Sequence, residues 1–336
     1  MKFEFDSAPA PASLQAVCED IQWLYMPLPF ALDHVNCWLL GEPDEQVLID
    51  TGVDNNGTRA HWNTVFKGIG QWPQHLITTH FHPDHSGLAG WFETQGCRQF
   101  TGSQIEIDIV HKLWASHGDD YAQVYIQWYT ENGLPAELVQ QVSQHGNTYR
   151  AKVHQPPAKK RWSWIEEGQT ITIAQRQYRV IIGRGHAPDM IMLYRADDQV
   201  LIAADQVLPS ISPNISVMPR LQDDNPLSSF LHTLTCLDAL PENTLVLPSH
   251  GLPFRGLHVR LQALRKHHDL RLEQVKEACV EPHSAFELFP ILYKRRLDAQ
   301  QMSFALGESL AHLHFLEQQG HIKRLANNGV TRFVAV

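Results

Sequence analysis

Four residues that can bind a metal ion lie within six positions, in the stretch His80-Phe81-His82-Pro83-Asp84-His85. Neutral imidazole and carboxylate groups are the ligands that suit divalent zinc, manganese or iron. The apolar residues 76–79 just before them predict a short strand, so this stretch would form the loop at a strand end. If the two halves of the loop face opposite ways, one peptide can serve two adjacent metal ions. The density and spacing of the ligands favour a metal site over a polar surface loop.

Three more potential ligands follow predicted strands later in the chain. His186 lies in the glycine-bounded turn GRGHAPD, Asp205 ends the apolar run 199–204, and His250 follows the apolar run 244–248. A lone histidine after a strand is more often a surface residue than a ligand. Several such residues in series can instead converge, because the ends of neighbouring strands meet at one edge of a sheet.

The elements that must position these side chains fall into two series. Strands are predicted, in chain order, at 21–28, 35–41, 45–52, 76–79, 169–174, 178–183, 190–194, 199–205 and 244–248. Helices are predicted at 86–94 and 226–240, after strands of each series. The pattern predicts an α/β fold in which two sheets lie between helical layers. Residues of about 103–145 lack strand patterning and are interpreted as a helical insertion.

The chain changes character after residue 255. Helices are predicted at 257–279, 285–294 and 298–319, followed by a β-hairpin whose turn is Asn328-Gly329. Three helices and a hairpin are the outline of a winged helix. We therefore predict a catalytic domain at 1–255 and a small winged-helix domain at 256–336.

In its metal-binding motifs the chain resembles the metallo-β-lactamase superfamily. Its hallmarks are a DTG-like turn, an HxHxDH loop, a later histidine, a bridging aspartate and a final histidine, matched here by residues 50–52, 80–85, 186, 205 and 250. The resemblance implies an αββα sandwich and a ligand set shared with the hydroxyacylglutathione hydrolases (glyoxalase II). It assigns His80, His82 and His186 to one metal and Asp84, His85 and His250 to the other, with Asp205 bridging them and Asp50 orienting the ligand loops.

Such a site predicts a metal-dependent hydrolase. Two divalent ions about 3.5–4 Å apart can hold a bridging hydroxide near neutral pH, which attacks an electrophilic carbonyl or phosphorus while Asp84 or Asp205 orients it. Zinc is the expected metal, with iron and manganese as alternatives. The predicted substrate is a small thioester, ester or lactone. Two alternatives stay open: an endoribonuclease or phosphodiesterase guided by the winged helix, and a persulfide dioxygenase-like enzyme that uses one iron.

Composition and charge bear on location and partners. Hydrophobic residues make up 43% of the 336 residues, five widely spaced cysteines include no CxxC pair, and neither a signal peptide nor a long apolar run is evident. We expect a cytoplasmic protein with no membrane partner. Residues 255–336 hold 12 Lys and Arg against 8 Asp and Glu, a charge of +4, which leaves −13 on the rest. This small surplus disfavours nucleic acid as a partner without excluding it, and a homodimer remains an alternative use of the C-terminal domain.

Two features suggest how a substrate is held. Aromatic residues recur at helical spacing within the insertion, among them Tyr121, Tyr125 and Trp128, and they either line an apolar substrate pocket over the metals or form the insertion's own core. Arg184, next to the predicted ligand His186, either binds a substrate anion or is a solvated surface residue.

Overall fold

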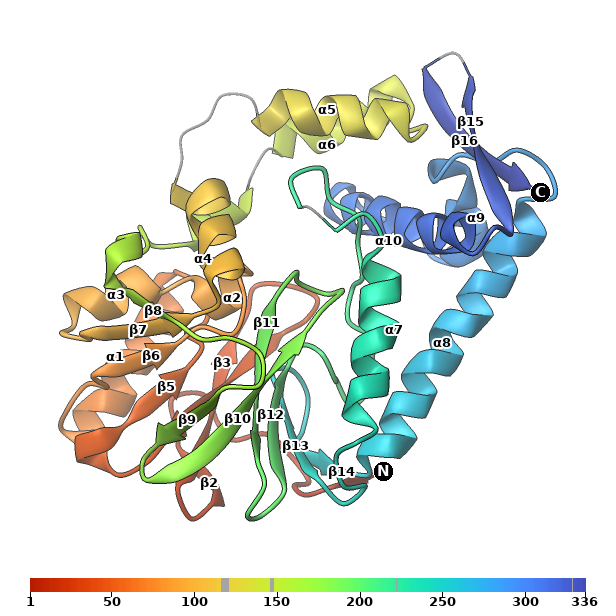
Figure 1. Cartoon of the computed structure of the whole chain (residues 1–336). Helices are drawn as coiled ribbons and strands as arrows, with labels where there is room; N and C mark the ends of the chain where they lie inside the picture. The colour runs from red at the N-terminus through yellow and green to blue at the C-terminus, as the bar shows by residue number, and fades with distance from the viewer. Residues whose placement is uncertain (116–120, 146–147, 222, 328) are drawn as a thin grey trace.

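The computed structural model describes residues 1–115, 121–145, 148–221, 223–327 and 329–336, apart from the side chains of Tyr121, Gln144, His145, Gln300, Ala326 and Asn327. Within these ranges the chain forms two seven-stranded sheets that lie face to face, with helices on both outer faces (Figure 1). The predicted α/β sandwich is confirmed.

The first sheet comes from the N-terminal half of the chain. Its strands, in spatial order, are β2 (Gln15–Cys18), β3 (Ile21–Pro27), β4 (His34–Leu40), β5 (Val47–Ile49), β6 (His75–Ile77), β7 (Gln99–Gly102) and β8 (Trp162–Trp164). The pairs from β2 to β5 are antiparallel, and those from β5 to β8 are parallel. Parallel neighbours send their carboxyl ends to the same edge, which is where the predicted ligand loop after β6 begins.

The second sheet comes mainly from the C-terminal half of the sandwich. Its strands, in spatial order, are β1 (Lys2–Phe3), β14 (Phe254–Arg255), β13 (Leu245–Pro248), β12 (Val200–Ala204), β11 (Met190–Arg195), β10 (Arg176–Gly183) and β9 (Thr170–Ile173). Strands β12 and β13 are parallel, so Asp205 and His250 emerge side by side where these strands end.

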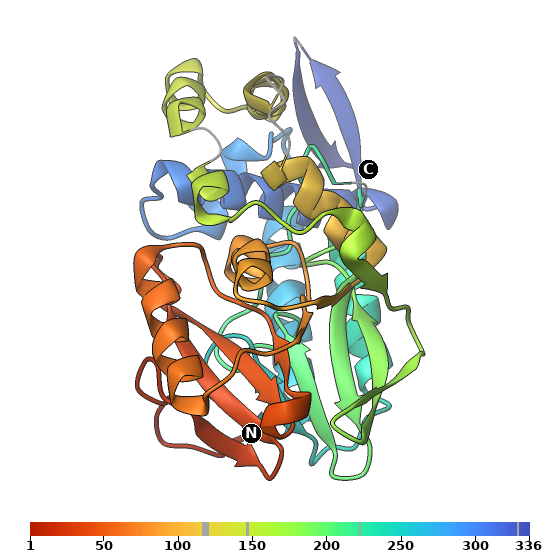
Figure 2. The ribbon, with the colours of Figure 1, turned by 90° about the vertical axis from the view of Figure 1, so that its left-hand side faces the viewer.

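Three hydrophobic layers hold the sandwich together. Side chains from the inner faces of both sheets, including Trp38 and Tyr178, form the central layer. On the outer face of the first sheet lie α1 (Asn56–Ile69) and α3 (Ala89–Thr94), and on that of the second lie α7 (Pro226–Leu237) and α8 (Leu257–Ala278) (Figures 1 and 2). Their buried faces provide the outer layers.

The helix α1 shows how local sequence sets these boundaries. The side chain of Asn55 accepts a hydrogen bond from the amide of Thr58 at the first turn, and Gly70 takes a left-handed conformation after the last. Trp62, Val65 and Phe66, at spacings of three and four, are buried against the first sheet.

The insertion between β7 and β8 is helical over most of the residues that the structure describes there, as predicted. It contains α4 (Gln104–Val110), a π-helical turn at His111–Ala115, α5 (Tyr121–Glu131) and α6 (Ala136–His145), and the short helices η3 (Thr148–Lys152) and η4 (Lys159–Arg161) follow α6. Helices α5 and α6 pack against each other and against the C-terminal part of the chain (Figure 1).

The C-terminal part continues from α8 into the short helices η5 (Phe286–Leu288) and α9 (Phe289–Leu292), the long helix α10 (Ala299–Gln318) and the hairpin of β15 (Ile322–Asn327) and β16 (Val330–Ala335). The predicted hairpin turn at Asn328 lies outside the described residues. The helices share one apolar cluster with the outer face of the second sheet, so this region packs on the sandwich. The predicted boundary at residue 256 and the winged-helix assignment stay predictions. Among the described helices, none has the length and apolar character needed to cross a membrane.

Candidate metal centre

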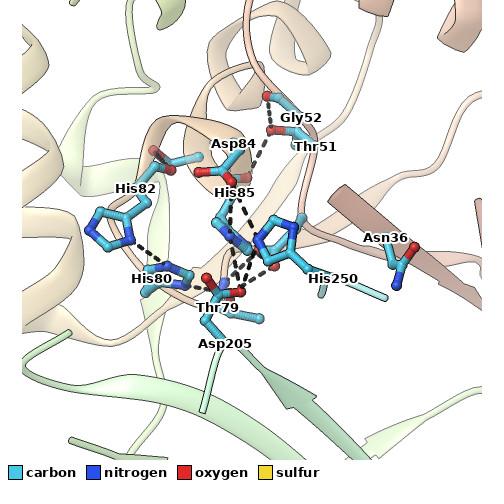
Figure 3. Close-up of polar contacts among 12 residues, drawn as sticks. Asn36, Thr51, Gly52, Thr79, His80, His82, Asp84, His85, Asp205 and His250 are labelled. Atoms are coloured by element: carbon cyan, nitrogen blue, oxygen red, sulfur yellow. Dashed lines mark hydrogen bonds and ion pairs between the residues drawn. The ribbon is translucent and has the colours of Figure 1, made fainter. Parts of the chain in front are cut away.

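The seven predicted ligands meet at the edge of the sandwich where β6, β10, β12 and β13 end, as Figure 3 shows for six of them. Three overlapping groups of their side-chain atoms lie within 4.8 Å of one another: His80, His82 and His186; His80, His85 and Asp205; and Asp84, His85 and His250. The backbone is strained where two strands enter this edge, because Asp50 and Ala204 have φ values of 62° and 46°.

The turn that carries His186 depends on a glycine. Gly185 has a φ of 104°, which favours glycine, and a Cβ atom there would lie 2.5 Å from the Cβ atom of Phe230 on α7. This close approach presses the turn against α7 and directs His186 toward the histidines of the β6 loop.

Three imidazole nitrogens face one another in the first half of the centre. His82 Nδ1 lies 2.9 Å from His80 Nε2 and 3.0 Å from His186 Nε2. Neutral imidazoles ligate a metal through a lone pair, so three such nitrogens at these separations suit a single ion with nitrogen ligands.

The second half combines two imidazoles with carboxylates. His85 Nε2 and His250 Nε2 each lie 3.6 Å from Asp84 Oδ2 and 3.4 Å from Asp205 Oδ1. The other oxygen of Asp205 lies 3.3 Å from His186 Nε2. Asp205 therefore turns one oxygen toward each half, which is the arrangement that a bridging carboxylate requires.

Outer partners fix the tautomers of four histidines. Asp50 Oδ2 accepts from Nδ1 of His85 at 2.7 Å, and the carbonyls of Asn214 and His34 accept from Nδ1 of His186 and His250 at 2.8 Å and 2.5 Å. The partner of His80 is Thr79, whose hydroxyl accepts from Nδ1 of His80 and donates to Asp50. With Nδ1 protonated, each Nε2 keeps its lone pair and faces the centre.

The buried atoms of the centre are under-satisfied without a ligand. His85 Nε2, His250 Nε2 and Asp205 Oδ1 are buried and make no hydrogen bond in the described part of the chain. Such atoms are costly in a folded protein unless something else occupies the space between them. A divalent cation fits, because all three are lone-pair donors directed at a common point.

The protonation states of the histidines also bear on whether the centre can hold a divalent cation. Burial lowers the pKa values of His80 and His82 well below the ordinary value, so both side chains are neutral at pH 7. Burial also opposes protonation of His85, but Asp84, Asp205 and Asp50 outweigh it and raise its pKa to about 10. For the side chains alone, His85 therefore carries a second proton, on Nε2, and a metal ion that binds would displace this proton, free the lone pair and supply the positive charge in its place.

Two further side chains support the loops and were missed from the sequence. Buried Asn36, on β4, donates to the carbonyls of Pro248 and Gly251, each at 2.8 Å, and so holds the turn that carries His250. A polar residue within the apolar run VNCWLL was the available signal.

The second is Glu106 on α4. It accepts from the backbone amides of Phe81 at 2.9 Å and Asp189 at 2.6 Å, joining the two loops that carry His80 and His186. Burial raises its pKa to about 8, while these two hydrogen bonds oppose the rise. Its setting in the run QIEIDIV gave no indication that it would be buried.

The predicted substrate contacts have different surroundings. Tyr125 and Trp128 are buried in a cluster with α6 and the C-terminal helices, which supports the packing alternative. The side chain of Tyr121 lies outside the described residues. The guanidinium of Arg184 pairs with Glu167 at 3.1 Å and Asp189 at 3.3 Å, so the anion-binding role gains no support.

Residues 31–250 match the family described as metallo-beta-lactamase superfamily, and residues 272–336 match the metallo-beta-lactamase-like C-terminal domain. The chain belongs to the metallo-β-lactamase superfamily, whose members are generally hydrolytic enzymes and usually bind divalent metals.

Solved structures agree with this assignment. A beta-lactamase domain protein from Burkholderia ambifaria is 35% identical, with 100% of this chain and 98% of that chain covered and a TM-score of 0.91. A metallo-beta-lactamase family protein from Thermus thermophilus is 28% identical, with coverages of 96% and 100% and a TM-score of 0.82. A metallo-beta-lactamase from Pontibacter korlensis, at 17% identity, covers 75% of this chain and 98% of its own, with a TM-score of 0.52, and shares the fold alone.

Proposed function

We propose that this protein is a dinuclear metal-dependent hydrolase of small thioesters, esters or lactones. The observation that carries the proposal is Asp205, whose two oxygens face His186 on one side and His85 and His250 on the other. His80, His82 and His186 would hold one ion and Asp84, His85 and His250 the other. We propose zinc, because the ligand set combines imidazoles with carboxylates, and zinc takes both in proteins.

Two divalent ions bound here would supply a water with a pKa of about 7 and would polarise the reacting carbonyl. The side chains around them then have distinct tasks. Asp50, with its side chain 2% exposed, only orients His85 and Thr79. Asp84 is the most exposed carboxylate of the centre, at 17% against 7% for Asp205. Asp84 is therefore the carboxylate best placed to accept a proton from the attacking water and to return it to the leaving group.

Charge supports a small acyl substrate over RNA. The predicted hairpin wing carries Arg324 and Arg332, but Arg324 pairs with Glu317 at 2.7 Å and Arg332 with Glu287 at 3.0 Å. These pairs neutralise arginines that a nucleic-acid-binding wing would direct at phosphates. The rest of the chain carries an excess of acidic residues, which would repel the same backbone.

A substrate panel tests the proposal. Protein reconstituted with zinc would be offered generic thioesters, esters, lactones and single-stranded RNA, and protein reconstituted with iron(II) would be offered a persulfide, with chelator-treated protein as the control for both. We expect metal-dependent hydrolysis of at least one acyl substrate. Cleavage of RNA without acyl hydrolysis would establish the nuclease alternative, and oxygen uptake with the persulfide would establish the dioxygenase alternative.

A further inference from the structure

The outer partner of His186 differs from those of the other ligands. Asp50, Thr79 and His34 lie in, or within two residues of, strands of the first sheet. Asn214 instead lies in the long segment between β12 and α7, which contains no helix or strand among its described residues. Its carbonyl nevertheless accepts from Nδ1 of His186 at 2.8 Å. Residues around Asn214 also hydrogen-bond to helices outside the two sheets. We call residues 208–217 the clamp segment.

Helix α10 holds one end of the clamp segment. The hydroxyl of Ser216 lies 2.5 Å from Asn214 Oδ1 and 3.4 Å from the carbonyl of Phe304, and the amide of Val217 donates to the carbonyl of Gly307 at 3.1 Å. A Cβ atom at Gly307 would lie 2.8 Å from the Cβ atom of Ser216 and 2.9 Å from the carbonyl oxygen of Val217. The helix backbone and the clamp segment therefore touch at a point where only glycine fits.

Helix α8 holds the other end. Arg260 donates to the carbonyls of Leu208 and Ile211, at 2.5 Å and 2.7 Å. Ser212 lies 3.1 Å from Nε2 of the buried His268.

A chain of hydrogen bonds links this contact back to α10. His268 Nδ1 lies 3.3 Å from His312 Nε2, and His312 Nδ1 donates to the carbonyl of Glu308 at 2.8 Å. Because Nδ1 of His312 is a donor, its Nε2 accepts from His268, and Nε2 of His268 in turn accepts from the Ser212 hydroxyl. Both ends of the clamp segment are thus tied to the C-terminal helices.

We propose that α8 and α10 position the metal ligand His186 through the clamp segment, with Gly307 and Ser216 as positioning residues. The inference rests on the metal centre of the proposed function. Carbonyls that accept from the outer nitrogen of a ligating histidine fix its ring, and disturbing such partners typically lowers metal affinity by about 10–100-fold. The C-terminal region would then be required for a complete first metal site.

Gly307→Ala tests this, and Gly68→Ala is the matched control. Both glycines lie inside helices, but a Cβ atom at Gly68 on α1 would meet nothing within 4 Å. Cobalt(II) binding to the full-length metal-free protein would be followed by its visible spectrum, and zinc affinity by competition with a chelator. We expect Gly307→Ala to lower affinity in one of two binding steps by about 10–100-fold and to change the cobalt spectrum, with Gly68→Ala unchanged in both.

Ser216→Ala adds no atoms and serves if Gly307→Ala fails to fold. This variant removes one neutral hydrogen bond to Asn214, and we expect it to lower metal affinity by about fivefold in the same binding step. The inference would be overturned if every variant that folds binds metal with wild-type affinity in both steps. It would also be overturned if a variant loses metal affinity equally in both steps and its melting temperature falls as well. Two tightly bound ions without hydrolysis of any substrate would contradict the proposed function only, whereas wild-type protein that binds no ion would overturn both.

Discussion

Replacing Asp50 by asparagine exchanges one buried oxygen for an NH2 group and leaves the shape of the side chain unchanged. Asp50 has a φ of 62°, and asparagine tolerates this left-handed conformation, so the turn should keep its backbone. The aspartate accepts from the amide of Thr79 at 2.8 Å through one oxygen, and from the Thr79 hydroxyl and Nδ1 of His85, both at 2.7 Å, through the other. Asparagine cannot accept at both positions.

If the side-chain oxygen of the asparagine continues to accept from the backbone amide of Thr79, His85 loses its hydrogen-bond acceptor. The NH2 group then faces Nδ1–H of His85, and the clash is relieved only if the proton moves to Nε2, the atom that faces the centre. A hydrogen bond to a charged group contributes about 1.5–3 kcal/mol, and so we expect zinc affinity to fall by about 10- to 150-fold in the step that involves His85.

The assay is stepwise zinc titration at pH 7.5 against a chromophoric chelator. Asp54→Asn is the matched control, because Asp54 lies in the same stretch but pairs with Arg59, at 2.7 Å, and contacts no ligand. We expect Asp54→Asn to bind both ions within about twofold of wild type. The same result for Asp50→Asn would refute the assignment of Asp50 as the group that sets the tautomer of His85.

Three further predictions concern pH, the loop supports and the insertion. Burial lowers the pKa of His312 to about 4, so between pH 4 and 6.5 the unfolded chain binds more protons than the folded protein. The free energy of unfolding should therefore fall by about 2 kcal/mol through this residue as the pH drops from 7.5 to 5. Denaturant unfolding of His312→Asn should show that much less pH dependence. Glu106→Ala leaves the amides of Phe81 and Asp189 unpaired and should cost about 2–5 kcal/mol in the same measurement at pH 7. Trp128→Ala should lower the free energy of unfolding by about 3–5 kcal/mol and leave KM unchanged, whereas a KM raised by one to two orders of magnitude would restore the hypothesis that these aromatic residues line a substrate pocket.

The sequence was most informative where signals are local. The ligand loop at 80–85 combines several metal-binding residues in one short stretch after an apolar strand, and His186, Asp205 and His250 also follow strands that the apolar runs predicted. The insertion was predicted at about 103–145, and β7 ends at Gly102 while α6 ends at His145. Turn residues and a change of periodicity are enough to mark such boundaries.

Other elements carried no such signal. Strands β7 and β8 have four and three residues, too few for a period of two to show, and they form because β7 adds to the parallel edge of β6 and β8 to that of β7. The support that Asn214 gives to His186 comes from a backbone carbonyl, which leaves no mark on residue type. The aromatic residues of α5 are regularly spaced, but spacing shows that a helix has an apolar face and not which partner covers it.

Metal content tests the central claim most directly. Elemental analysis of gently purified wild-type protein and of Asp205→Ala compares the whole centre with one that lacks the carboxylate facing both halves. We predict close to two equivalents of divalent metal per wild-type chain, and at most one, with no hydrolytic activity, in Asp205→Ala. A single equivalent of iron in the wild-type protein, or two equivalents and full activity in Asp205→Ala, would contradict a dinuclear centre bridged by Asp205.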